Sequence, residues 1–212
     1  MPCSLATERL ELRAKLGDMA WDTERTRRQL LTAATAEFAE HGPAGARIDR
    51  IAEAAGINKE RIYSYFGNKD ALFEAVIVHE LAEVFEEVPL EGEGPQAIGA
   101  YAAGLFDRIV RKPEIGRLMA WEGLVRGGDV PGRTVREEHC RSKVGAVQRA
   151  LPGVSKSDAG QLLLTVVTLT DGWAVFPQLA EMFTADRFGD RRDAVRRLAE
   201  REAAAAMERA AS

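Results

Sequence analysis

Helical periodicity runs through almost the whole chain, and it constrains the fold more than any other feature of the sequence. Apolar residues recur at helical spacing between breaks that contain glycine and proline. β-branched runs are short, and strict alternation of apolar and polar residues never lasts for several residues. The sequence therefore predicts an all-α fold of about nine helices.

Length and composition exclude several classes of protein. A chain of 212 residues can bury a sizeable core, and its two cysteines, Cys3 and Cys140, form neither a disulfide framework nor a zinc cluster. No apolar run reaches the roughly 18 residues that cross a bilayer. Glu8, Glu11 and Asp18 interrupt the start of the chain, where a signal peptide would be apolar. We therefore expect a cytoplasmic protein with no membrane partner.

The first part of the chain predicts four consecutive helices. Their expected ranges are about 23–41, 47–55, 58–66 and 69–88. Gly42 and Pro43 end the first helix, and Gly56 can adopt the left-handed conformation that ends the second. Asn58 can accept a backbone hydrogen bond and so cap the third.

The second and third of these helices are joined by a short turn that contains Gly56, an arrangement that can present a helix to the major groove of DNA. The third helix buries Ile62 and Phe66, so its remaining side chains face outward. Arginine and lysine can bond guanine edges or phosphates, and tyrosine hydroxyls reach phosphates. The candidate DNA-binding residues are Arg47, Asn58, Lys59, Glu60, Arg61, Tyr63, Tyr65 and Lys69.

The charge balance of this region does not by itself indicate a nucleic-acid partner. Residues 22–70 carry eight basic and eight acidic side chains, whereas a DNA-binding domain is expected to show a basic surface. Arg47, Lys59, Arg61 and Lys69 nevertheless lie near helix starts around the third helix. We therefore expect the positive groups to share one face.

Two segments resemble the DNA-binding domain of the tetracycline-repressor (TetR) family. They are RRQLLTAATAEFAEHG at 27–42 and IDRIAEAAGINKERIYSYFGNKDALFEAVI at 48–77. The resemblance implies a homodimeric, ligand-responsive transcription regulator with three DNA-binding helices and a divergent helical C-terminal domain. It also implies phosphate contacts from Tyr63, Tyr65 and Lys69, whereas Lys59, Glu60 and Arg61 face bases or backbone.

The sequence departs from the family pattern at two positions. Arg47 stands where a threonine or serine usually caps the second helix, so the cap is weakened. Glu60 replaces a residue that is often small; it either accepts a hydrogen bond from a cytosine amino group or points to solvent. The family's N-terminal arm is also shorter than residues 1–21. Either the first 18 residues are an extension ahead of a start at Met19, or this segment forms a helical arm.

We expect three parts in the chain: an N-terminal extension at 1–21, a helix-turn-helix DNA-binding domain at 22–68, and a helical ligand-binding and dimerisation domain at 69–212. A helix over about 157–173 and a charged last helix over about 190–210 are expected to form the homodimer interface. The last helix has a narrow apolar face that a partner helix would suit, made of Val195, Leu198, Ala199, Ala203 and Ala206.

A small-molecule effector is expected to bind between the fourth and eighth helices and to shift the fourth. The candidate ligand-binding residues are Tyr101, Phe106, Trp121, Glu122, Thr168, Asp171 and Trp173. A second interpretation is that the aromatic residues simply fill the core and the threonines bond to their own helix. Asp171 and Glu122 would each need a partner if buried, which favours a cationic or hydrogen-bond-donating ligand.

No catalytic, metal-binding or cofactor-binding motif is present. His41, His79 and His139 lie on separate predicted helices, outside any metalloprotease or hydrolase motif. The favoured function is a transcriptional regulator, most simply a repressor that a small apolar or amphipathic effector releases from a pseudo-palindromic operator. An all-helical small-molecule-binding protein or enzyme without DNA function is the alternative.

Overall fold

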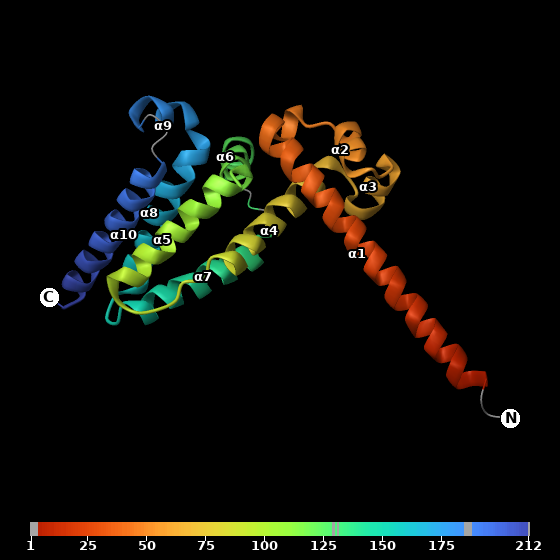
Figure 1. The fold of residues 1–212 in the computed structure, drawn as a ribbon, viewed down its shortest axis with the longest axis horizontal. Coiled ribbons are helices and arrows are strands. Elements are labelled where there is room, and N and C mark those ends of the chain that lie inside the picture. The colour runs from red at the N-terminus through yellow and green to blue at the C-terminus, as the bar shows by residue number, and fades with distance from the viewer. Residues whose placement is uncertain (1–3, 129, 131, 185–187, 212) are drawn as a thin grey trace. The chain divides into compact units, whose positions relative to one another are not determined.

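The structure is a computed structural model that describes residues 4–128, 130, 132–184 and 188–211, with side chains from Thr23 onward except at 188 and 189. Every regular element in this part of the chain is an α-helix, which confirms the all-α prediction (Figure 1). The helices are α1 (Ser4–Gly45), α2 (Ile48–Ala55), α3 (Lys59–Phe66), α4 (Lys69–Glu87), α5 (Gly94–Arg111), α6 (Glu114–Arg126), α7 (Arg133–Ala150), α8 (Lys156–Val175), α9 (Pro177–Thr184) and α10 (Phe188–Ala211).

The described chain divides into two compact units, one through Val76 and one from Ile77 onward. The division falls inside α4, so this helix begins in the first unit and ends in the second. No single described helix is long and apolar enough to cross a bilayer. Only α8 and α9 together reach that length and composition, and they meet at a 91° bend.

The first unit has a small core made by α1, α2, α3 and the start of α4. Phe38 of α1 meets Phe73 of α4 edge to face, with ring centroids 5.1 Å apart. Ile51 and Ile62 are the fully buried residues that α2 and α3 contribute. Gly42 has φ 67° and ψ 172°, which are not helical values, so α1 is kinked at the break that the sequence predicted. The predicted helix start near 23 was wrong, because α1 continues back to Ser4 and needs no cap at that point.

The second unit is built around α5, which lies beside α8 and α10 (Figure 1). A Cβ atom at Gly99 would stand 2.5 Å from the side chain of Glu200, which shows how closely α5 and α10 approach. Val195 and Ala203 are fully buried, and the narrow face of the last helix packs mainly on α5 of the same chain.

The short helix α9 was missed at the sequence level. Its start is Pro177, which lacks a backbone N–H and cannot extend α8. The chain bends at Phe176, whose N–H still bonds the carbonyl of Gly172. The helix count is therefore ten in the described chain, one more than the sequence predicted.

Candidate nucleic-acid interface and effector site

Helix α3 is held by its two ends and one buried side chain. The side chain of Asn58 accepts a hydrogen bond from the N–H of Glu60 at 3.1 Å, as expected of an N-cap. The N–H of Gly67 bonds the carbonyl of Tyr63 at 2.8 Å and closes the other end. Between them Ile62 is 1% exposed. The turn into α3 depends on Gly56, whose φ of 65° favours glycine.

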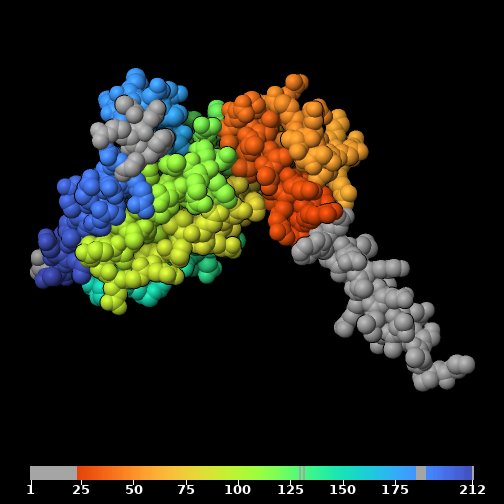
Figure 2. All heavy atoms as spheres, viewed as in Figure 1, coloured from red at the N-terminus to blue at the C-terminus, as the bar shows by residue number. Residues whose placement is uncertain are grey.

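Most other side chains of α3 lie on the molecular surface, where Figure 2 shows α2 and α3 in orange, whereas Phe66, which the sequence predicted to be buried, is half-buried. Lys59, Glu60 and Arg61 are exposed, and Tyr63 is 47% exposed. Tyr65 is half-buried, and its hydroxyl lies 3.4 Å from the carbonyl oxygen of Thr23. The polar face of α3 is therefore open to a partner.

Lys59 already has an acidic neighbour. Its ammonium group lies 3.3 Å from the carboxylate of Asp49 on α2, and the hydrogen bond and charge of Asp49 raise the pKa of Lys59. Asp49, Glu53 and Glu60 line a shallow hollow between α2 and α3. Lys59 therefore has an internal acidic partner in the folded chain.

Sequence reasoning missed Glu37, which organises the start of α2. Its Oε1 atom accepts hydrogen bonds from the N–H of Arg47 and from Nε of Arg50, both at 2.8 Å. Burial raises the pKa of Glu37, but the hydrogen bonds from Arg50 and Arg47 and the nearby positive charge lower it by more. The net result is a pKa below the ordinary value of 4.5. Arg47 makes no side-chain cap, as expected. A half-buried acid that bonds a residue ten positions away carries no short-range signal.

Lys69 is half-buried and contacts a neighbouring segment of the chain. Its ammonium group donates to the carbonyls of Ala44 and Ala46, at 3.4 and 3.3 Å. These carbonyls follow the break at Gly42 and precede α2. Lys69 therefore connects the start of α4 to the end of α1 and to Ala46, which follows it.

The predicted effector residues do not share one cavity. A pocket of about 360 Å³ lies between α8, α9 and α10, and of the predicted residues it contains Thr168 and Trp173. Tyr101 and Phe106 are buried in the core, and Phe106 meets Trp173 edge to face at 5.5 Å. Trp121 is half-buried outside this pocket. The pocket wall is mainly apolar and consists of Thr168, Leu169, Gly172, Trp173, Phe176, Leu179, Ala180, Phe183, Thr184 and Arg191.

The two predicted carboxylates have different environments. Buried Glu122 forms a two-pronged ion pair with Arg136, at 2.7 and 3.0 Å. Asp171 is half-buried, and no hydrogen-bond partner for its side chain occurs in the described chain. Burial raises the pKa of Asp171 to about 6, against the effect of the Arg108 charge. Thr168 bonds its own helix at the carbonyl of Leu164.

Comparison with known proteins identifies the family. Residues 30–76 match the bacterial regulatory proteins of the tetR family, and residues 97–203 match the tetracyclin repressor-like C-terminal domain. The chain belongs to the TetR family. It is therefore a DNA-binding regulator of transcription, not an enzyme. Within the described residues, no group of three or more His, Cys, Asp or Glu side chains is placed to hold a metal ion.

Individual TetR-family relatives extend the match over most of the chain. The HTH-type transcriptional repressor SCO4008 of Streptomyces coelicolor is 38% identical over 164 residues, which cover 76% of this chain and 84% of that protein. The HTH-type transcriptional repressor NicS of Pseudomonas putida is 30% identical over 82% of each chain. The crystal structure of SCO4942 from Streptomyces coelicolor superposes with a TM-score of 0.68 at 30% identity, covering 83% of this chain and 97% of that one.

Proposed function

We propose that this regulator is a repressor that binds a pseudo-palindromic operator as a homodimer and leaves it when a small apolar or amphipathic effector binds the second unit. The observation that carries the proposal is the outward face of α3, where Lys59, Arg61 and Tyr63 are exposed beside a fully buried Ile62. The similar proteins SCO4008 and NicS are both named as repressors, which supports the direction of regulation.

The reading helices of two copies would enter successive major grooves. Half-site centres would then lie about 34–36 Å apart, or a multiple of that distance. Arg61 is proposed to reach base edges and Lys59 base edges or phosphates, and the phosphate contacts are assigned to Tyr63, Tyr65, Lys69 and Arg47. The side-chain oxygen of Asn58 accepts the N-cap bond, and its amide NH2 group is proposed to donate to the DNA. Glu60 remains available to a cytosine amino group.

The test is binding to the DNA upstream of the protein's own gene. Fluorescence anisotropy should show binding that weakens steeply with salt, because phosphate contacts release counterions. A random duplex of equal length should bind at least about a thousandfold more weakly, as is typical of specific sites. Equal affinity for both duplexes would contradict the proposal.

We assign dimerisation to α8 and α10. Leu164 and Val167 of α8 are 59% and 38% exposed, and Leu198 of α10 is 37% exposed. These apolar side chains lack cover within one chain, which is typical of an interface. Leu164→Glu should yield monomers in sedimentation velocity, because it places charge in the interface. Val135→Glu, on an exposed site of α7, is the matched control and should leave the dimer intact.

The effector site is proposed at the pocket between α8, α9 and α10, with Asp171 as a second candidate contact. The pocket offers Trp173, Phe176 and Phe183 as apolar surface. Asp171 is on the same helix but not in the pocket wall, and a ligand that contacts its carboxylate should carry positive charge or a hydrogen-bond donor. Such a ligand releases DNA only if it binds the non-DNA-competent conformation more tightly, with a coupling of about 1–3 kcal/mol.

A thermal-shift screen with lipophilic cations, acyl compounds and aromatic compounds tests this assignment. A compound that binds in the pocket should lose its shift in Phe183→Ala, because Phe183 lines the wall. Phe183 is 83% exposed, so its truncation leaves the core intact. Met182→Ala is the control, since Met182 is 71% exposed on the same helix but outside the wall. Equal shifts in both variants would place the compound elsewhere.

A further inference from the structure

The second half of α4 carries an unusual charge for its position. Glu80, Glu83, Glu86 and Glu87 lie in its last two turns, and no basic residue occupies the last turn. Negative side chains near the C-terminus of a helix are unfavourable, because the helix dipole already places negative charge there. Within α4 only His79 lies near one of these carboxylates, 3.6 Å from Glu83, and it counts as a cation only when protonated, so the other described cations near them come from outside the helix.

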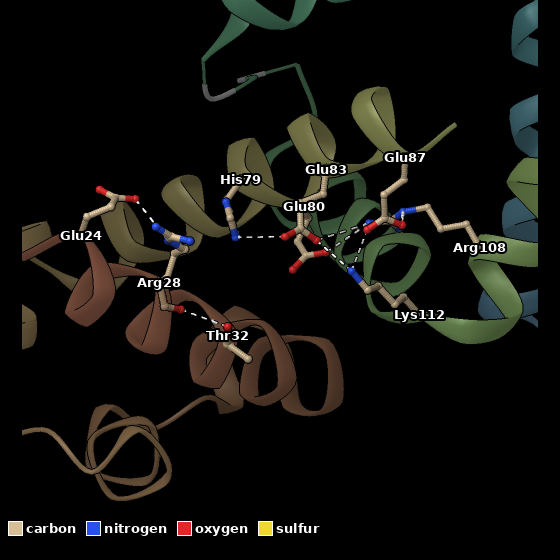
Figure 3. Close-up of polar contacts among 9 residues, drawn as sticks. All are labelled: Glu24, Arg28, Thr32, His79, Glu80, Glu83, Glu87, Arg108 and Lys112. Carbon is tan, nitrogen blue, oxygen red and sulfur yellow. Dashed lines mark hydrogen bonds and ion pairs between the residues drawn. The ribbon is translucent and has the colours of Figure 1, made fainter. Parts of the chain in front are cut away.

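Arg108 of α5 and Lys112, the residue that caps the end of α5, supply those cations (Figure 3). Lys112 donates hydrogen bonds to Glu83 at 3.0 Å and to Glu87 at 2.9 Å. Arg108, one turn earlier, lies 3.7 Å from Glu80, 3.9 Å from Glu83 and 3.3 Å from Glu87. Hydrogen bonding to Lys112 is also the main reason why the pKa of Glu87 lies below its ordinary value.

Arg108 and Lys112 differ in burial and in bonding. The side chain of Lys112 is 43% exposed, whereas that of Arg108 is 1% exposed. None of the three guanidinium nitrogens of Arg108 makes a hydrogen bond in the described chain, although three carboxylates lie within 4.0 Å. A buried guanidinium normally forms two-pronged bonds to one carboxylate. Arg108 instead lies near three carboxylates and makes a hydrogen bond to none of them.

The spacing of these partners matches the helical repeat. Glu80, Glu83 and Glu87 are three and four residues apart, so they form one row along α4 with about one partner per turn. A shift of α4 along its axis by one turn, about 5.4 Å, would exchange one carboxylate for the next without leaving Arg108 unpaired. A buried Arg108 would therefore favour two discrete positions of α4 over those in between.

We propose that Arg108 is a positioning residue of the regulator: it selects the position of α4 relative to α5. Because α4 is one continuous helix that begins in the DNA-binding unit, its position determines where the reading helix of each copy is held. This inference rests on the proposed dimeric function, since the distance between two readers matters only on a two-half-site operator.

The test compares Arg108→Met, Arg108→Lys and Lys112→Met in the full chain. Binding to the upstream DNA and to a random duplex is measured by anisotropy, and hydrogen exchange is followed in peptides covering 77–88 and 159–174. Arg108→Met should weaken upstream binding by about tenfold and accelerate exchange over 77–88 by a similar factor, because preorganisation is lost. Random-duplex binding should change by less than about twofold, since phosphate contacts are untouched.

The other variants separate positioning from general stability. Arg108→Lys keeps the buried charge and should restore upstream binding to within about threefold of wild type. Lys112→Met removes a half-exposed pair and should also stay within about threefold. Uniformly faster exchange over both peptides with equal loss on both duplexes would mean a merely structural role and would overturn the inference. Unchanged upstream binding in Arg108→Met would overturn it as well. Failure of wild type to prefer the upstream DNA would instead refute the proposed function.

Discussion

The ammonium group of Lys69 lies 3.3 Å from the carbonyl oxygen of Ala46. The sequence resemblance assigned Lys69 to a DNA phosphate, and the structure adds a bond that connects α4 to the segment before α2. The two roles are compatible, because an ammonium group has three donors and two carbonyls occupy at most two of them. Lys69 would thus hold the DNA-binding unit in shape and carry charge toward the backbone of the operator.

Lys69→Ala and Arg61→Ala should affect DNA binding differently. Removing Lys69 should weaken binding to every duplex by about the same factor and reduce the salt slope by about one, as expected for a phosphate contact. Removing Arg61 should cost about 1–3 kcal/mol on the operator and less on other sequences, because it reads bases. Anisotropy titrations on upstream and random duplexes measure both. Equal losses for both variants on both duplexes would contradict the assigned roles.

Asp49→Asn should strengthen binding to DNA. The change removes the carboxylate that holds Lys59 at 3.3 Å, so a phosphate no longer competes with an internal partner. We expect a gain of a few fold on random duplex DNA and a salt slope that is steeper by about one. Glu53→Gln is the matched control, because it removes one negative charge from the same exposed helix without freeing Lys59. A gain of the same size in Glu53→Gln would show that only net charge matters.

Glu37→Gln should destabilise the DNA-binding unit by about 1–3 kcal/mol at neutral pH, the usual contribution of charged hydrogen bonds. The folded state holds the pKa of Glu37 below its ordinary 4.5, so the ionised form stabilises the fold above that value. The stabilisation disappears as the pH falls through the lowered pKa. Urea unfolding of wild type and variant should therefore converge in acid.

The control for this prediction is Glu40→Gln, on the same helix with its side chain 73% exposed. It should change the unfolding free energy by less than about 0.5 kcal/mol, as surface substitutions do. A loss in Glu40→Gln equal to that in Glu37→Gln would assign the effect to overall charge. A gap between Glu37→Gln and wild type that persists in acid would contradict the pH argument.

The local features of this fold could be predicted from sequence, and the tertiary ones could not. The cap at Asn58, the left-handed turn at Gly56 and the burial of Ile62 each follow from a few neighbouring residues. Glu37 bonds residues ten and thirteen positions away, and Arg108 meets glutamates more than twenty positions away, so neither contact has a local pattern. Pro177 was a local signal for a helix break, but the residues on both sides of it follow helical periodicity, so the sequence predicted one helix instead of two.

The predicted effector residues also show that sequence patterns identify local features better than tertiary ones. Aromatic and polar residues at helical spacing identified Trp173 and Thr168, which do line a pocket. The same pattern also selected Tyr101 and Phe106, which are buried in the core. Spacing along one helix cannot distinguish a face that meets another helix from a face that meets a cavity. That distinction depends on how α5, α8 and α9 pack.

Asp171→Asn should stabilise the second unit at neutral pH and change its pH dependence. Burial raises the pKa of Asp171 from 3.8 to about 6, so the folded state keeps a proton that the unfolded chain releases. Between these values the wild-type free energy of unfolding falls as the pH rises, and above about 6 the full cost of the buried charge remains, at most about 3 kcal/mol. The variant has no such charge, so its melting temperature should exceed that of wild type at pH 7.5 and match it near pH 4. Asp193→Asn is the control, because its side chain is 53% exposed, and it should leave both melting temperatures unchanged.

If a cationic effector neutralises Asp171, its thermal shift should vanish in Asp171→Asn and weaken in wild type as the pH falls below about 6. A cation whose shift survives in Asp171→Asn would bind elsewhere, and equal melting temperatures for variant and wild type at pH 7.5 would contradict the buried charge itself.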